Sequence, residues 1–286
     1  MIPVLQALLN GLVSGALLAV PAIGFTAMFA VLRFPNFAVS GTATLGAFAG
    51  YLVYAAVPSI VLSLAAAFLV AGIVGLAFDQ AAHLPLVKQG ALPAAIASIA
   101  SGLVMENIVR LGFGNELRGY DRPIARDMTF ADLRVSPQQL ETMGIAIAIM
   151  LIVFAALAFT RVGKAMRASA DNPELAALKG IRPERVAMMA SFVGMGLVGI
   201  GGMLLGLDSS IDPLTGTRIL LSLFAAAVLG GLGSVPGAVL GALLIGVAEE
   251  LSVLVVGSTY RSAVGFFAIL IVLTLRPRGL LGERAF

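Results

Sequence analysis

Long apolar runs, nearly free of charged residues, repeat from one end of the chain to the other. They fall at about 4–32, 37–57, 59–78, 92–113, 139–160, 186–207, 219–232, 235–256 and 259–275. A helix needs about 20 apolar residues to cross a hydrocarbon core of about 30 Å. The runs are long, rich in Ala, Leu and Gly, and lack the alternation of strands. They predict an all-α polytopic membrane protein with eight or nine transmembrane helices.

Charge composition supports the same fold class. Only 12% of the residues are charged, against roughly 25% in soluble domains. The net charge of +3 belongs to the loops of a membrane protein, so we expect membrane lipid and no nucleic acid among the partners.

Basic residues beside the runs predict the orientation, because Lys and Arg collect on the cytoplasmic side. The stretch 161–185 holds six bases against three acids, and the tail adds Arg276, Arg278 and Arg284 against Glu283. We therefore expect both in the cytoplasm. The stretch 110–141 carries five bases and five acids and is free to lie outside. Counting crossings back from residue 161 places loop 79–91 in the cytoplasm and the N-terminus outside.

These assignments predict a single transmembrane domain over residues 1–286, with an external loop at 113–137 and a cytoplasmic loop at 161–185. The run 219–232 has about 14 residues, too few to cross unless it is tilted or continued by irregular backbone. Either one span with re-entrant helices or three spans would return the C-terminus to the cytoplasm. Both arrangements stay open, which is why the span count is eight or nine.

Two segments contain the Pro and Gly residues that interrupt helices. They are 33–50, with Pro35, and 230–246, with Gly231, Gly233 and Pro236. Matched interruptions in two halves of a chain indicate the binding region of a transporter. The alternative is close helix packing, since many of these glycines are four residues apart. Broken helices and close packing both remain open for 230–246.

The missing residue types exclude most chemistry. The chain has no Cys and a single His, His83, so thiolate or His-cluster metal sites are excluded and a Ser-His-Asp site would need that one residue. The phosphate-binding pattern G-x-x-x-x-G-K-[ST] does not occur. We expect no cofactor, no metal and no catalysis, and a function in moving a solute.

Residues 171–180 have the pattern of a short capped helix in the predicted cytoplasmic loop. Asp171 is the expected N-cap, Pro173 lies in the first turn, and Glu174 takes the capping-box position. Leu175 and Leu178 lie on one side, and Gly180 ends the helix. Such a helix could dock on a cytoplasmic partner or simply lie at the membrane interface.

Several stretches carry a resemblance to a known family. Residues 163–172 (GKAMRASADN), followed by Ala176, Leu178, Gly180 and Ile181, resemble the cytoplasmic loop of ABC-importer permeases. Residues 230–241 (GGLGSVPGAVLG) are similar to the G-G-x-G-S-x-x-G-A-x-x-G element of the branched-chain amino acid permease family, and 276–282 (RPRGLLG) to its ending. Residues 36–48 and 98–107 resemble two further elements. The chain departs from the family at Val39-Ser40-Gly41, where His-Gly-acidic is usual, and at Glu106, where Gln is usual.

The resemblance implies a permease subunit of an ATP-driven importer in the bacterial inner membrane, not itself an enzyme. Its partners would be a second permease subunit, paralogous or identical, two cytoplasmic ATP-binding subunits and an external substrate-binding protein. The helix at 171–179 would be the coupling helix that sits in a groove of an ATPase subunit. The coupling residues would be Arg167, Asp171, Asn172, Glu174, Leu175, Ala176, Leu178 and Gly180.

Polar residues inside the spans are the candidates for the substrate pathway, because such groups are costly in lipid. They are Asn36, Ser40, Thr42, Thr44, Ser98, Ser101, Glu106 and Asn107, together with Gly231 and Gly233 of the second break. For Ser and Thr the alternative is a hydrogen bond to the preceding helical turn, and for Glu106 it is pairing with Arg110. The resemblance implies branched-chain or other small amino acids as substrates. The alternatives are an ion-coupled secondary transporter of an amino acid or an amide such as urea, a passive channel and, least favoured, a membrane enzyme.

Overall fold

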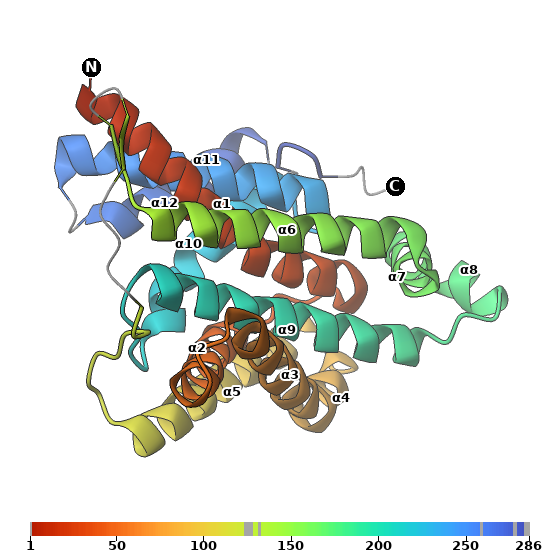
Figure 1. Cartoon of the computed structure of the whole chain (residues 1–286). Coiled ribbons are helices and arrows are strands. Elements are labelled where there is room, and N and C mark those ends of the chain that lie inside the picture. The colour runs from red at the N-terminus through yellow and green to blue at the C-terminus, as the bar shows by residue number, and fades with distance from the viewer. Residues whose placement is uncertain (1, 123–127, 131–132, 258–259, 277–278, 283–286) are drawn as a thin grey trace.

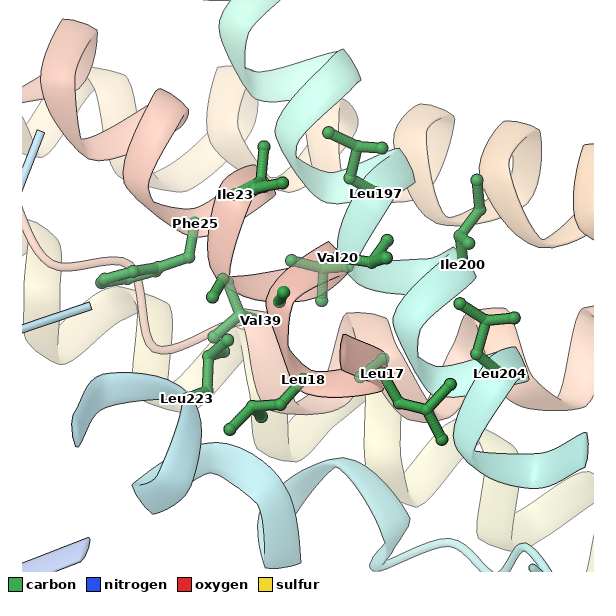
Figure 2. Packing of buried hydrophobic residues seen from close by; sticks show 14 of the residues in the cluster. Leu17, Leu18, Val20, Ile23, Phe25, Val39, Leu197, Ile200, Leu204 and Leu223 are labelled. Atoms are coloured by element: carbon green, nitrogen blue, oxygen red, sulfur yellow. The ribbon is translucent and has the colours of Figure 1, made fainter. Parts of the chain in front are cut away.

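Helix α1 (Ile2–Leu32) runs through the middle of the molecule (Figure 1). The computed structural model describes residues 2–122, 128–130, 133–257, 260–276 and 279–282. Every residue of α1 from 15 to 28 is buried. The reason is that α1 carries apolar residues on all of its sides and not along a single stripe. Figure 2 shows α1 side chains such as Leu17 and Val20 packed beside Leu204 and Leu223 from other helices.

The remaining elements of the described residues follow α1 along the chain. In chain order they are α2 (Val39–Ala56), α3 (Ile60–Phe78), the π-helix η1 (Asp79–His83), α4 (Leu84–Val87), α5 (Ala91–Phe113), β1 (Met128–Phe130), β2 (Leu133–Val135), α6 (Pro137–Phe159), α7 (Arg161–Asp171), α8 (Pro173–Leu178), α9 (Pro183–Asp208), α10 (Thr215–Gly230), α11 (Val235–Val256) and α12 (Arg261–Leu275). The two strands form a small antiparallel hairpin. Each of the nine predicted apolar runs corresponds to one apolar helix among the residues that the structure describes.

Seven of those helices are long and apolar enough to cross a membrane. They are Ile2–Leu32, Val39–Ala56, Ile60–Val87, Ala91–Phe113, Pro137–Phe159, Pro183–Asp208 and Val235–Val255, and two shorter apolar helices cover Thr215–Gly230 and Ala263–Leu275. The predicted all-α polytopic membrane fold is confirmed. The shorter pair is the region where the sequence left the span count open, and the orientation of the termini stays a prediction.

Glycines let the central helices approach backbone to backbone. A Cβ on Gly11 of α1 would lie 2.6 Å from the Val247 Cα of α11, and one on Gly246 would lie 2.6 Å from the Gly11 carbonyl oxygen. Gly46 of α2 contacts Gly199 of α9 in the same way. Close packing through small residues is therefore realised, as the four-residue spacing predicts.

Replacing Gly46 by valine is expected to separate α2 from α9, because a Cβ at this position would lie 2.3 Å from the Gly199 Cα. Overpacking of this kind costs about 1–3 kcal/mol. Thermal unfolding in detergent measures the loss. Gly144→Val in α6 is the matched control, because a Cβ there meets nothing within 4 Å. Equal stability of the two variants would contradict this packing.

Both Pro- and Gly-rich segments form breaks between helices. Helix α1 ends at Leu32 and α2 begins at Val39, with Arg33 in the left-handed region at φ 60°. Helix α10 ends at Gly230 and α11 begins at Val235, with Gly231 at φ 106°. At the second break the chain also packs closely, because a Cβ on Gly230 would lie 2.1 Å from the Gly237 carbonyl oxygen. At 230–246 the sequence therefore forms both a break between helices and a close helix contact.

The two predicted loops lie at opposite ends of the helices (Figure 1). At one end, the Gln6 amide donates to the Arg134 carbonyl oxygen at 2.8 Å, which joins the start of α1 to β2. Helices α7 and α8 lie at the other end. There the Leu280 and Leu281 amides donate to the Leu229 and Gly230 carbonyl oxygens. This grouping agrees with the predicted sidedness, and the cytoplasmic position of the α7–α8 end stays a prediction. The charged residues Arg126, Asp127, Asp132, Arg278, Glu283 and Arg284 lie outside the described residues.

Candidate functional site

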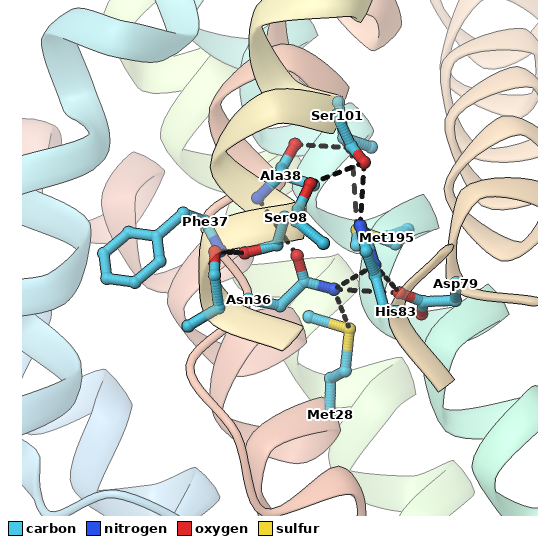
Figure 3. Close-up of polar contacts among 12 residues, drawn as sticks. Met28, Asn36, Phe37, Ala38, Asp79, His83, Ser98, Ser101 and Met195 are labelled. Carbon is cyan, nitrogen blue, oxygen red and sulfur yellow. Dashed lines mark hydrogen bonds and ion pairs between the residues drawn. The ribbon is translucent and has the colours of Figure 1, made fainter. Parts of the chain in front are cut away.

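A buried polar cluster lies where the α1–α2 break meets η1 and α5 (Figure 3). The Asn36 side chain, fully buried, donates from Nδ2 to Asp79 Oδ1 at 3.0 Å. Its Oδ1 accepts the Ala38 amide at 3.0 Å. On the α5 side, the Ser98 hydroxyl accepts the Phe37 amide at 2.9 Å. The cluster thus fixes the nonhelical segment 33–38 to two other helices.

His83 lies between a hydroxyl and a carboxyl. The Ser101 hydroxyl lies 2.9 Å from the Ala97 carbonyl oxygen and 2.9 Å from His83 Nε2. His83 Nδ1 contacts Asp79 Oδ1, and two facing lone pairs would repel. One proton must therefore lie between imidazole and carboxyl, on either partner. Asp79 and His83 are both 0% exposed, so this proton is held away from solvent.

Helices α7 and α8 form the other candidate site, at one end of the molecule. Asn172 caps α8, because its Oδ1 accepts the Leu175 amide at 2.9 Å. Leu175 and Leu178 are 54% and 84% exposed, whereas Ala176 is 4% exposed. Gly180, at φ 86°, ends the helix in the left-handed conformation that glycine adopts readily. The α8 helix therefore has two exposed leucine side chains, Leu175 and Leu178.

A family model described as "Branched-chain amino acid transport system / permease component" matches residues 7–275. The chain belongs to this family. The permease is 30% identical over 294 residues to the high-affinity branched-chain amino acid transport system permease protein BraD of Pseudomonas aeruginosa, across 98% of this chain and 96% of that protein. It is 28% identical over 295 residues to LivH of Escherichia coli, with the same coverage.

A probable branched-chain amino acid transport permease protein, LivH of Methanocaldococcus jannaschii, is 28% identical over 283 residues, across 93% of this chain and 89% of that protein. Among solved structures, PsaBC from Streptococcus pneumoniae in complex with Fab aligns with a TM-score of 0.49 and 13% identity, over 94% of this chain and 92% of that one. Family membership and the apolar helices make this chain a multi-pass permease of the cytoplasmic membrane.

The prediction of a loop at 79–91 containing His83 is wrong for the first part of that range. Helix α3 continues through η1 into α4, and Asp79 and His83 lie on it as a buried pair. The two residues are four apart, the spacing at which helical side chains meet. This spacing is the feature of the sequence that indicates a helical pair. The polar residues Asp79, Gln80 and His83 instead favour the end of a span. A π-turn inside a helix frequently marks a functional site.

Ser101, His83 and Asp79 are ordered like the three groups of a hydrolytic triad. Ser101 Oγ contacts the Ala97 carbonyl oxygen as well as His83 Nε2, each at 2.9 Å, and all three side chains are buried among helices. The family is one of transporters, not enzymes, and the three residues hold helices together instead.

The other predicted pathway residues are spread over different contacts. Ser40 and Thr42 donate to carbonyl oxygens of the preceding turn, at 3.2 and 2.8 Å, which is the alternative given for them above. Thr44 donates to the Pro213 carbonyl oxygen at 3.2 Å. Only Asn36, Ser98 and Ser101 of the predicted set lie in the polar cluster. Their part in a pathway stays a prediction.

Glu106 is paired, as the alternative interpretation has it. Its carboxylate accepts from Arg110 at 2.9 Å and from the Thr217 hydroxyl of α10 at 3.0 Å. Asn107, next to it, is exposed and donates to the Leu103 carbonyl oxygen at 2.8 Å. Glu106 therefore joins α5 to α10 at a point separate from the Asn36 cluster.

Gly231 and Gly233 lie at the second break and not in the cluster. The C-terminal segment covers this break, because a Cβ on Gly279 would lie 2.5 Å from the Gly231 amide nitrogen. Phe37 of the first break stacks on Phe224 of α10, the helix that leads to the second break, with ring centroids 4.7 Å apart.

The predicted N-cap at Asp171 is wrong by one residue. Asp171 is the last residue of α7, and Asn172 is the cap of α8. Glu174 is consequently the second residue of α8 and not the third, so it misses the capping-box position. Arg167 lies on α7 and donates to the Ala158 carbonyl oxygen at 3.4 Å.

At the opposite end, Tyr120 attaches the loop after α5 to α2. Its hydroxyl is buried and donates to the Ala47 carbonyl oxygen at 2.7 Å. Burial raises the pKa of Tyr120 above its ordinary value of 10.0. The hydroxyl keeps its proton for this hydrogen bond well into alkaline solution.

Proposed function

We propose that this permease is the transmembrane subunit of an ATP-driven importer that forms the path for branched-chain or other small amino acids. The observation that carries the proposal is the α7–α8 segment. A capped helix with exposed Leu175 and Leu178 stands beside basic residues at one end of a membrane bundle. Because these two leucines lie in a charged loop at the end of the bundle and not on a long apolar helix, they support docking of a protein partner.

We assign this end to the cytoplasm from its excess of bases. Two ATP-binding subunits would dock there, a second permease subunit would complete the path, and an external binding protein would deliver the substrate. On this view 1–286 is one transmembrane domain, with 161–185 as its cytoplasmic coupling loop and 113–137 as its external loop. The α8 leucines would enter a groove of the ATPase, and the bases would steer association.

The polar residues at and after the α1–α2 break are the proposed substrate pathway. They are Asn36, Ser40, Thr42, Thr44, Ser98, Ser101, Glu106 and Asn107, with Gly231 and Gly233 at the second break. The relatives BraD and LivH are named as branched-chain amino acid permeases, which supports the same substrate class for this chain. Selectivity would reside mainly in the binding protein.

One observation favours the second candidate, an ion-coupled transporter. The Asp79–His83 pair is fully buried on an apolar helix long enough to cross a membrane, and buried acid and His pairs serve as proton relays in such proteins. An ATP-driven importer and a proton-coupled transporter predict opposite energy requirements. This difference makes the two proposals separable.

The test is co-purification followed by transport. The chain is coexpressed with the other subunits of its transport system, purified through a tag on the permease, and reconstituted into vesicles with its binding protein and radiolabelled leucine. We expect the ATP-binding subunit in the eluate and uptake that requires ATP but survives a protonophore. Uptake by the isolated chain, abolished by the protonophore, would instead establish the second candidate.

A further inference from the structure

The segment that carries α8 is attached to the α1–α2 break through one side chain. The guanidinium of Arg33 donates to the Ala170 carbonyl oxygen in the last turn of α7. Carbonyl groups at a helix C-terminus lack intrahelical partners and favour a cation. Asn172, the cap of α8, follows two residues later. Arg33 therefore contacts the backbone directly beside the docking helix.

Arg33 is held in an unusual conformation at this contact. Its φ of 60° is the only positive value outside glycine in the described part of the chain. A residue other than Gly in this region is strained, and such strain persists only where the surroundings impose it. The Arg33 amide still donates to the Phe29 carbonyl oxygen at 2.9 Å. Arg33 thus ends α1 and turns its side chain toward α7.

The residues after Arg33 lead from this contact to the buried cluster. Phe34 is 1% exposed. The centroids of the Phe34 and His83 rings lie 6.1 Å apart, in an edge-to-face arrangement. Asn36 binds Asp79, and Phe37 binds Ser98 and stacks on Phe224. Six consecutive nonhelical residues therefore connect α7 with η1, α5 and α10. A displacement of α7 would therefore shift contacts with η1, α5 and α10 together.

We infer that Arg33 is the positioning residue that transmits movement of the α7–α8 segment to the polar cluster of Asn36, Asp79 and His83. The inference rests on the proposed function, in which an ATPase moves α8. Coupling between sites is carried by chains of packed side chains and hydrogen bonds. Arg33 donates the one hydrogen bond between α7 and the break among the described residues, beside the buried cluster in which Met166 of α7 packs with Ala27 of α1. It has no contact with substrate and acts only through its neighbours.

The test separates the guanidinium from the backbone strain. In Arg33→Gly the left-handed backbone becomes unstrained but the donor is lost, whereas Arg33→Lys keeps a cation that can reach a carbonyl oxygen. We measure leucine transported per ATP hydrolysed by the complete complex in vesicles. We expect Arg33→Gly to lower this ratio at least about fivefold, the lower range of energetic coupling between sites, with assembly retained. Arg33→Lys should restore most of the ratio.

Lys88→Ala is the matched control, because Lys88 is exposed and forms no side-chain hydrogen bond or ion pair among the described residues. Arg33→Asn is a second variant, since asparagine also tolerates a left-handed backbone. A wild-type ratio in the Gly or Asn variant would overturn the inference, as would loss of assembly with the ATPase in both. If the wild-type complex itself transports without ATP, the proposed function fails instead, before any variant is compared.

Discussion

Asp79→Leu is expected to lower the free energy of unfolding by about 3–5 kcal/mol, the cost of removing one partner from a buried pair. The reason is that His83 and Asn36 both direct polar atoms at Asp79 Oδ1 in a place with no exposure to solvent. Asn36 Nδ2 would keep only long contacts, to Met28 Sδ at 3.9 Å and to His83 Nδ1 at 3.5 Å, and a buried donor that loses its acceptor bears a desolvation penalty. Chemical unfolding in detergent, followed by circular dichroism, measures the loss.

Two further variants test whether the loss belongs to the pair. Asp79→Asn keeps an acceptor oxygen for one donor and should lose less than the leucine variant. The double variant with His83→Leu removes both members and should recover part of the stability, because an apolar replacement of a whole buried pair is often neutral. A loss for Asp79→Leu below about 1 kcal/mol, the size of a typical substitution, would contradict the geometry of the cluster.

The sequence predicts the helices well because membrane crossing depends on two properties visible in it, length and apolarity. The predicted run 186–207 is the helix Pro183–Asp208, and 235–256 is Val235–Val256. The exception is α3, which continues past Phe78. Asp79 is polar, which favours the end of a span at Phe78, but its contacts with His83, four residues later, and with Asn36 in the α1–α2 break allow its burial. Asn36 lies 43 residues earlier in the chain, and a single sequence does not show such a pairing.

The displaced cap at Asp171 has a different cause, and the sequence did contain the decisive signal. Asp and Asn are both strong N-cap residues. The residue directly before a proline is pushed out of the helical region, and Asn172 lies at φ −148° and ψ 100°. Pro173 is therefore the first residue of α8, which makes Asn172 the cap and leaves Asp171 in α7. The effect of Pro173 on the preceding residue therefore identifies Asn172 as the N-cap, even though Glu174 favours Asp171 through the capping-box spacing.

Leu178→Asp is expected to reduce ATP-dependent uptake at least about tenfold, because it would place an unpaired charge in the apolar contact proposed between α8 and the ATP-binding subunit. Leu178 is 84% exposed, so the change leaves the fold of the permease intact, as surface substitutions usually do. The effect should appear as lost co-purification of the ATP-binding subunit or as ATP hydrolysis without uptake. Leucine uptake and ATPase activity of the reconstituted complex measure both.

The matched control is Leu117→Asp, another exposed leucine, at 66%, in the loop at the opposite end of the helices. It introduces the same charge where no ATPase is proposed and should leave uptake ATP-dependent. Substitution of Ala176 tests something else, because Ala176 is buried and its carbonyl oxygen accepts the Ile181 amide at 3.0 Å. Bulk there would distort α8 itself. Full uptake by the Leu178→Asp complex would therefore count against docking through the exposed leucines, whereas a defect at Ala176 alone would show only that α8 must be folded.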